Sequence, residues 1–109
     1  MFRPVCSILL VAVLAGCDGA PATSYDSSNP VNCLAIFGLA NVGARAKGDQ
    51  QLSREMQERQ TALVKAQGGL DWLNKIAPEA KQFASQLERD KDGGATETLL
   101  RQCKERHPR

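Results

Sequence analysis

The chain has 109 residues, which is enough for one small domain. Its 14 basic and 12 acidic side chains give a formal net charge of +2, and the two signs alternate along the sequence. Because phosphate neutralisation needs clustered Lys and Arg, this balance argues against a nucleic-acid partner.

Residues 1–16 have the pattern of a secretory signal peptide. Arg3 is the only charge before Asp18, and residues 5–15 form an apolar run of about 11 residues. A membrane-spanning helix needs roughly 20 apolar residues, so this run is too short to cross a bilayer. It fits the hydrophobic region of a leader, and we expect residues 1–16 to be removed.

The apolar run ends in Leu14-Ala15-Gly16-Cys17, which resembles the lipobox of bacterial lipoproteins. The resemblance implies cleavage before Cys17 and a diacylglyceryl thioether on its sulfur, usually with a third acyl chain on the new amino group. Several acyl chains together hold a protein on a membrane effectively permanently. The alternative is an ordinary signal peptide that is cut nearby, at Ala15-Gly16 or beyond Ala20-Pro21.

Residues 17–30 are predicted to be a lipidated cysteine and a flexible tether. They are rich in Gly, Pro, Ser and Asp and have little to bury, so the domain is expected to sit close to the bilayer. Asp18 resembles the inner-membrane retention signal of enterobacterial lipoproteins, which favours the inner membrane and leaves the outer membrane as the alternative. Tyr25 is expected to be an idle exposed side chain, with an interfacial or partner contact as the alternative.

Residues 31–107 are predicted to form an all-α domain, a small three- to four-helix bundle. The first helix spans about residues 31–46, and residues 33–40 are apolar on every side of it. A helix that is apolar all round is typical of a central, buried position. Asn29 or Ser28 is the expected N-cap.

The second helix is predicted to begin near Asp49 or Gln50 and to continue to about Ile76 through Gly68-Gly69. Two glycines cost roughly 1 kcal/mol each in a helix interior, so a break there is the alternative. The apolar stripe keeps a four-three spacing across them, however, and favours one long, kinked helix. The stripe consists of Leu52, Met56, Leu63, Ala66, Leu70, Leu73 and Ala77.

Two more helices are predicted after it. The third begins at Pro78, which suits a first-turn position, and runs to about Lys91. Its apolar stripe is Ala80, Phe83, Ala84 and Leu87. The fourth follows a Gly-Gly turn and spans about residues 95–106, with Leu99, Leu100 and Cys103 on one face.

The cysteines predict one disulfide. Of the four, Cys6 leaves with the leader and Cys17 is assigned to lipid, so Cys33 and Cys103 remain in an oxidising compartment. A bridge between them would staple the first helix to the last and close a loop of about 70 residues, worth roughly 4 kcal/mol in the chain-entropy model. The alternatives are an intermolecular bridge and free buried thiols.

No set of residues has the spacing of a catalytic, cofactor or metal site, so we expect a non-enzymatic protein with no small-molecule substrate. His107, the only histidine, is interpreted as a solvated residue of a basic tail. Arg59 and its neighbouring carboxylates indicate ion pairs on a wet helix surface. Trp72, the only tryptophan, is interpreted as a core-edge residue, with an interface anchor as the alternative.

The leading hypothesis is an interaction or structural module of the cell envelope, anchored through Cys17 and facing the periplasm. Its partner would be an envelope protein or a second copy. The two cysteines near the ends of a small secreted helical domain also resemble, in architecture, the HdeA-type acid-stress chaperones. That resemblance implies a periplasmic chaperone or stress protein as the alternative, although such chaperones are soluble and this chain carries a lipobox.

Overall fold

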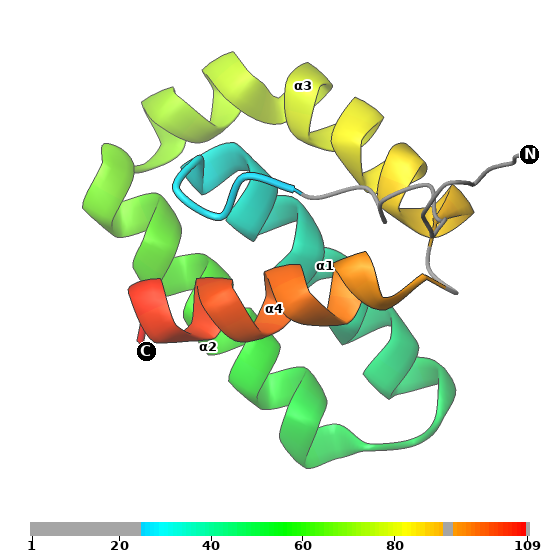
Figure 1. Cartoon of the computed structure of the whole chain (residues 1–109). Coiled ribbons are helices and arrows are strands. Elements are labelled where there is room, and N and C mark those ends of the chain that lie inside the picture. The colour runs from blue at the N-terminus through cyan, green and yellow to red at the C-terminus, as the bar shows by residue number, and fades with distance from the viewer. Residues whose placement is uncertain (1–24, 91–92, 109) are drawn as a thin grey trace, which may run out of the picture.

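The computed structural model describes residues 25–90 and 93–108. Four helices make up this part of the chain, and they are α1 (Pro30–Ala46), α2 (Gln50–Gln67), α3 (Leu70–Arg89) and α4 (Gly94–Arg106). Figure 1 shows α1 in the middle of the fold, where it packs against each of the other three helices. The predicted all-α bundle is therefore confirmed.

Helix α1 is the buried centre of the domain, as its uniformly apolar sequence predicts. Every residue from 33 to 37 is buried, and Phe37 is completely enclosed. The Asn29 side chain accepts a hydrogen bond from the Val31 amide at 2.9 Å, so the predicted N-cap is present. At the other end, Gly48 has a φ of 77° and allows the chain to turn back into α2.

The prediction of one long helix through Gly68-Gly69 is wrong. Gly68 and Gly69 have φ values of 131° and 78°, so α2 ends at Gln67 and α3 begins at Leu70. Glycine adopts positive φ without the clash that a Cβ atom would cause, and the two residues form a sharp corner. The corner turns α3 back onto α1, a contact that a continuous helix would not make.

The apolar stripe does not stay on one buried face across this corner. Met56 and Leu63 of α2 are buried, whereas Ala66, Leu70 and Ala77 are exposed. The four-three spacing therefore continues in the sequence although the helix that it implies does not.

The predicted start of a helix at Pro78 is also wrong, because Pro78 lies inside α3. Proline lacks the amide hydrogen that would bond to the carbonyl of Asn74, four residues earlier. Both residues are on the exposed side of α3, where water can hydrate that carbonyl. Ile76 and Leu87 of the same helix reach the core on either side of the proline.

All four helices contribute to one core. The large, fully buried side chains are Phe37, Met56, Leu63, Leu87 and Leu99 together with Cys33 and Cys103. One polar pair joins α1 to α2 among the buried residues, since Ser53 donates a hydrogen bond to the Asn41 side chain at 2.5 Å. None of the helices in residues 25–90 and 93–108 is long and apolar enough to cross a membrane.

Candidate functional site

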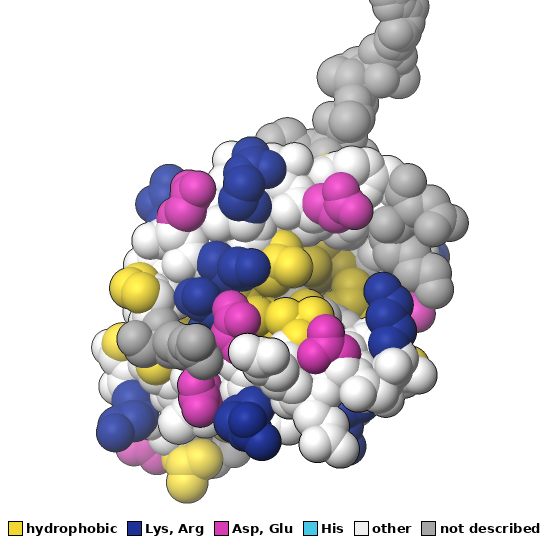
Figure 2. Space-filling model, turned by 90° about the horizontal axis from the view of Figure 1, so that it is seen from below, with side chains coloured by type: hydrophobic (Ala, Val, Ile, Leu, Met, Phe, Trp, Pro, Cys, Tyr) yellow, Lys and Arg dark blue, Asp and Glu magenta, His cyan; other side chains and the backbone are white. Residues whose placement is uncertain are grey.

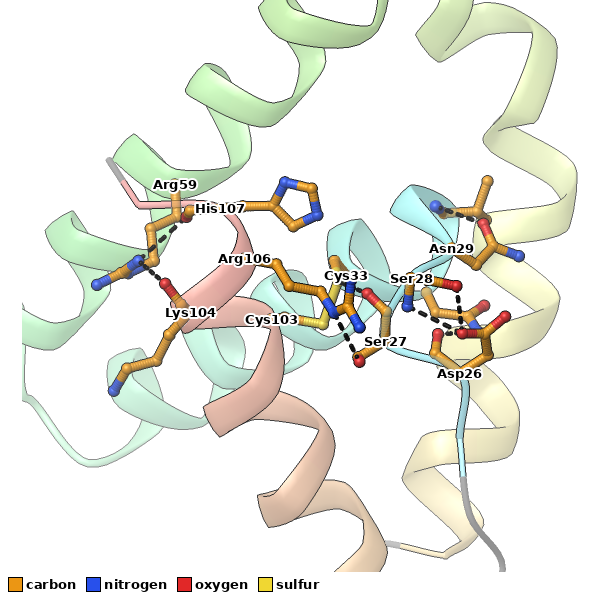
Figure 3. Close-up of a disulfide and its surroundings, with 12 residues drawn as sticks. Asp26, Ser27, Ser28, Asn29, Cys33, Arg59, Cys103, Lys104, Arg106 and His107 are labelled. Carbon is orange, nitrogen blue, oxygen red and sulfur yellow. Dashed lines mark hydrogen bonds between the residues drawn. A yellow bond between two sulfur atoms is a disulfide. The ribbon is translucent and has the colours of Figure 1, made fainter.

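Cys33 and Cys103 form the predicted disulfide. Their Cα atoms are 5.4 Å apart, and both side chains are fully buried. The bridge joins the beginning of α1 to the end of α4 (Figure 3), two segments that lie 70 residues apart in the sequence. Neither an intermolecular bridge nor a pair of free thiols applies to these residues.

Residues 25–29, which we call the N-terminal strap, run directly beside this disulfide. Ser27 is buried, and its hydroxyl oxygen accepts a hydrogen bond from Arg106 Nε at 3.0 Å (Figure 3). The Ser27 carbonyl oxygen lies 3.3 Å from the Cys33 sulfur. The strap therefore contacts the beginning of α1 and the end of α4, the two segments that the disulfide joins.

Asp26 shapes the strap into a turn that leads into α1. Its carboxylate accepts hydrogen bonds from the Ser28 amide at 2.9 Å and from the Ser28 hydroxyl at 2.5 Å. These bonds lower the pKa of Asp26 below its usual value. The Asn32 side chain donates to the Asp26 carbonyl at 3.0 Å, which ties the turn to the first residues of α1.

Tyr25 fixes the beginning of the strap to α3. Its ring meets the ring of Phe83 edge to face, with the centroids 5.3 Å apart and the planes at 88°. Its hydroxyl donates a hydrogen bond to the Asp90 carboxylate just after α3. Burial and this hydrogen bond raise the pKa of Tyr25 to about 12. The prediction that Tyr25 is an idle exposed side chain is therefore wrong.

Arg59 of α2 caps the last turn of α4. Its Nη1 donates to the carbonyl oxygens of Lys104 at 3.3 Å and His107 at 3.2 Å (Figure 3). These are carbonyls that a helix end leaves without partners in its own backbone. Its Nε also pairs with Glu55 at 3.0 Å, so the predicted ion pair on α2 is present. The two side chains are only 13% and 23% exposed, so the pair is partly buried and does not lie on a wet surface.

His107 is not a solvated tail residue. The residue is half-buried, and its Nε2 atom is buried with no hydrogen-bond partner among the described residues. Burial, followed by the nearby Arg106 charge, lowers the pKa of His107 below 6.5. Arg59 bonds to the backbone carbonyl of His107 from 48 residues away, so no local pattern could reveal that the end of α4 is held against α2.

The α2–α3 corner, which we define as residues 68–72, presents apolar surface. Trp72 is half-buried and packs against the core, in agreement with its interpretation as a core-edge residue. Leu70 is 72% exposed although the sequence pattern places it on the buried stripe. The positive φ values of the two glycines are what turn its side chain outward.

An apolar groove lies between α1 and α3, with a volume of about 800 Å³. We call it the α1–α3 groove. Its walls include Gly38, Leu39 and Val42 of α1 and Ala77, Ala80 and Ala84 of α3. Figure 2 shows a face of the molecule on which hydrophobic side chains gather in a hollow that charged side chains surround. The sequence signal for such a groove is the set of alanines on α3, although their spacing by itself predicts only a core stripe.

Within the described ranges, no three His, Cys, Asp or Glu side chains gather where a metal ion would bind. The predicted lipidation site Cys17, the leader at residues 1–16 and the first part of the predicted tether lie outside the described residues.

Comparison with protein-family models gave no match, and no similar protein was found among the curated proteins or the solved structures.

Proposed function

We propose that this chain is the precursor of a small bacterial envelope lipoprotein, whose disulfide-stapled helical domain is a non-enzymatic interaction module on the periplasmic side of a membrane. The leader and the lipobox around Cys17 support the anchor. The Cys33–Cys103 disulfide supports the compartment, because such bridges persist where the surroundings are oxidising.

The observation that carries the interaction role is the exposed apolar surface of the α2–α3 corner. Leu70 is 72% exposed, and Trp72 beside it is half-buried and held against the core. Burying a leucine side chain contributes roughly 1.5–3 kcal/mol, which a partner surface would supply. Tryptophan held in a fixed position is a frequent anchor of protein interfaces. The partner is an envelope protein or a second copy of this chain.

The N-terminal strap sets how far this corner can be from the bilayer. Because Tyr25 is docked on α3, only eight residue steps separate Cys17 from the folded domain. At 3.3–3.6 Å per residue these steps span at most about 29 Å. The corner lies at the other end of α3, thirteen residues or about 20 Å of helix from Phe83, so the anchor would keep it within about 50 Å of the bilayer.

Crosslinking in intact cells, followed by recovery of the protein from membranes, tests this role. Leu70→Gln is expected to abolish a specific crosslinked product, and Cys17→Ala is expected to abolish it by releasing the anchor. Thr98→Gln is the control, since Thr98 is exposed on α4 and belongs to neither the corner nor the α1–α3 groove. It introduces the same amide away from both surfaces and should leave the product unchanged.

A product that survives Leu70→Gln would contradict the role of the corner. A product that survives Cys17→Ala at the same yield would contradict the need for the anchor. Mass-spectrometric identification of the crosslinked peptide separates an envelope partner from a second copy.

The second candidate, an acid-stress chaperone, is favoured by one observation, the burial of His107. Protonating this half-buried imidazole beside Arg106 is unfavourable in the folded state, so acid weakens the end of α4. Circular dichroism and an aggregation assay with an acid-denatured client at about pH 3 test this function. A domain that keeps its fold and does not protect the client at that pH would contradict it.

A further inference from the structure

The α1–α3 groove exists because small side chains meet where the two helices face each other. Ala77, Ala80 and Ala84 line the groove from α3, and Gly38 lines it from α1, where the Gln60 amide nitrogen lies 3.1 Å from the position that a Cβ atom would take. The larger apolar residues of α3, such as Leu87, are buried in the core instead. The fold thus leaves an open apolar groove about 800 Å³ in volume on the surface.

The chemistry of the groove favours a ligand without polar groups along its length. Apolar side chains form most of the walls, and the polar side chains that line it are Gln60, Lys81, Ser85 and Glu88. A wall of this kind recognises its ligand through burial of apolar surface, which is non-directional. A hydrocarbon chain meets that requirement, with its polar end at the charged border.

The N-terminal strap brings Cys17 within reach of the groove. Tyr25 is held on Phe83, the neighbour of the groove residue Ala84, and on Asp90, two residues beyond Glu88. Cys17 lies eight residue steps before Tyr25 and so within about 29 Å of it. The groove extends along α3 from Leu73 to Glu88, fifteen residues or about 22 Å of helix.

We infer that the α1–α3 groove binds one acyl chain of the lipid carried by Cys17 of the same molecule. The inference rests on the lipidation proposed above and names a ligand for a surface separate from the α2–α3 corner. A tether of this length gives an effective concentration in the mM range, so a weak intrinsic affinity is enough for occupancy. If three chains are attached, two remain in the bilayer, which is sufficient for stable anchoring.

The first test measures whether the groove takes an acyl chain at all. The secreted chain from residue 17 onward, with Cys17→Ser to prevent lipidation, is titrated with the fluorescent fatty acid cis-parinaric acid. We expect saturable binding of one molecule per chain. Ala77→Gln replaces part of the apolar wall with a longer, polar side chain and should weaken binding about tenfold, because that side chain occupies the space over the groove that the acyl chain would fill.

Ala66→Gln is the matched control. Ala66 and Ala77 are both exposed alanines inside helices, but Ala66 does not line the groove. Binding to Ala66→Gln should equal that of the parent chain. Absence of saturable binding up to mM concentrations of probe, or equal weakening by the two variants, would overturn the inference.

The second test identifies the source of the chain. Cells are fed a fatty acid that carries a diazirine, and the lipoprotein is irradiated and recovered from membranes. An acyl chain on Cys17 is expected to crosslink, within one molecule, to the tryptic peptide of residues 76–81, which contains Ala77 and Ala80. Ala77→Gln should remove this crosslink, and Ala66→Gln should retain it.

The two proposals fail in different ways. A recovered chain with an unmodified Cys17 thiol overturns both the lipoprotein assignment and the source of the ligand, whatever the fatty-acid titration shows. A chain with lipid on Cys17 that crosslinks only to bilayer lipids, or to the groove of a second copy, overturns the inference and leaves the anchor intact.

Discussion

Reduction of the Cys33–Cys103 disulfide is expected to lower the free energy of unfolding by about 4 kcal/mol. The bridge closes a loop of 70 residues, and the chain-entropy model gives about 4 kcal/mol for a loop of that length. A domain of this size has a total stability of roughly 4–12 kcal/mol. The bridge therefore accounts for between a third and all of it, and the midpoint temperature should fall by roughly 16–32 °C.

The measurement is thermal unfolding by circular dichroism of the chain from residue 18 onward, in its oxidised form and after reduction in denaturant and refolding with reductant present. Denaturant is needed because both sulfurs are fully buried. The double variant Cys33→Ala/Cys103→Ala serves as the control, since reductant should leave its midpoint unchanged. The difference between the reduced parent and the double variant gives the packing contribution of the two sulfurs.

A midpoint that falls by less than about 5 °C on reduction would refute this reasoning. Such a result would mean that the bridge contributes about 1 kcal/mol or less, and that the helices hold together through the core alone.

Further predictions concern the corner, the strap and the end of α4. Gly69→Ala should destabilise the domain by roughly 1–3 kcal/mol in urea unfolding because its φ is 78°, whereas Gly43→Ala in a helix should stabilise it by roughly 0.5–1 kcal/mol. Tyrosinate absorbance of Tyr25, the only tyrosine, should titrate near pH 12, and Asp90→Asn should lower that midpoint. In NMR titration His107 should have a pKa below 6.5.

The sign of each pH effect follows from the direction of the pKa shift. The raised pKa of Tyr25 means that its contribution to stability is complete below pH 10 and is lost as the pH rises through about 12. The lowered pKa of His107 means that its contribution is complete above about pH 6.5 and declines as the pH falls below that value. His107→Gln should remove this acid-side decline.

Specific results would contradict these expectations. A Cβ atom added at Gly69 or Gly43 meets no other atom within 4 Å, so the two variants differ only in the backbone angles that they require. Equal effects of the two substitutions on stability would show that alanine adopts the positive φ of the corner without strain. A Tyr25 midpoint near 10 would mean that the strap is undocked. A His107 pKa at or above 6.5 would place its imidazole in water.

The centre of the fold was predictable from the sequence because it depends on local apolarity and on the number of cysteines available for pairing. Uniform apolarity over residues 33–40 predicts a buried α1, and assigning Cys17 to lipid leaves a single pair of cysteines. The corner at Gly68-Gly69 was not predictable from the apolar stripe, since the spacing is the same whether Leu70 is buried or turned outward. Only the backbone angles at the two glycines distinguish the cases.

The strap and the end of α4 escaped prediction for a different reason. The Tyr25 side chain contacts Phe83 and Asp90, and the backbone carbonyl of His107 accepts a hydrogen bond from Arg59, all of them distant in the sequence. A tyrosine in a polar stretch has the same local sequence pattern whether or not its ring packs against an aromatic residue of another helix. Such contacts are consequences of the tertiary fold and have no signature of their own.

Intact-mass spectrometry of the native protein recovered from bacterial membranes tests the central claim most directly. The account predicts a chain that begins at Cys17, with a diacylglyceryl group on its sulfur and one remaining disulfide between Cys33 and Cys103. A chain that begins at Gly16 or beyond Ala20, or one with a free thiol at Cys17, would contradict it.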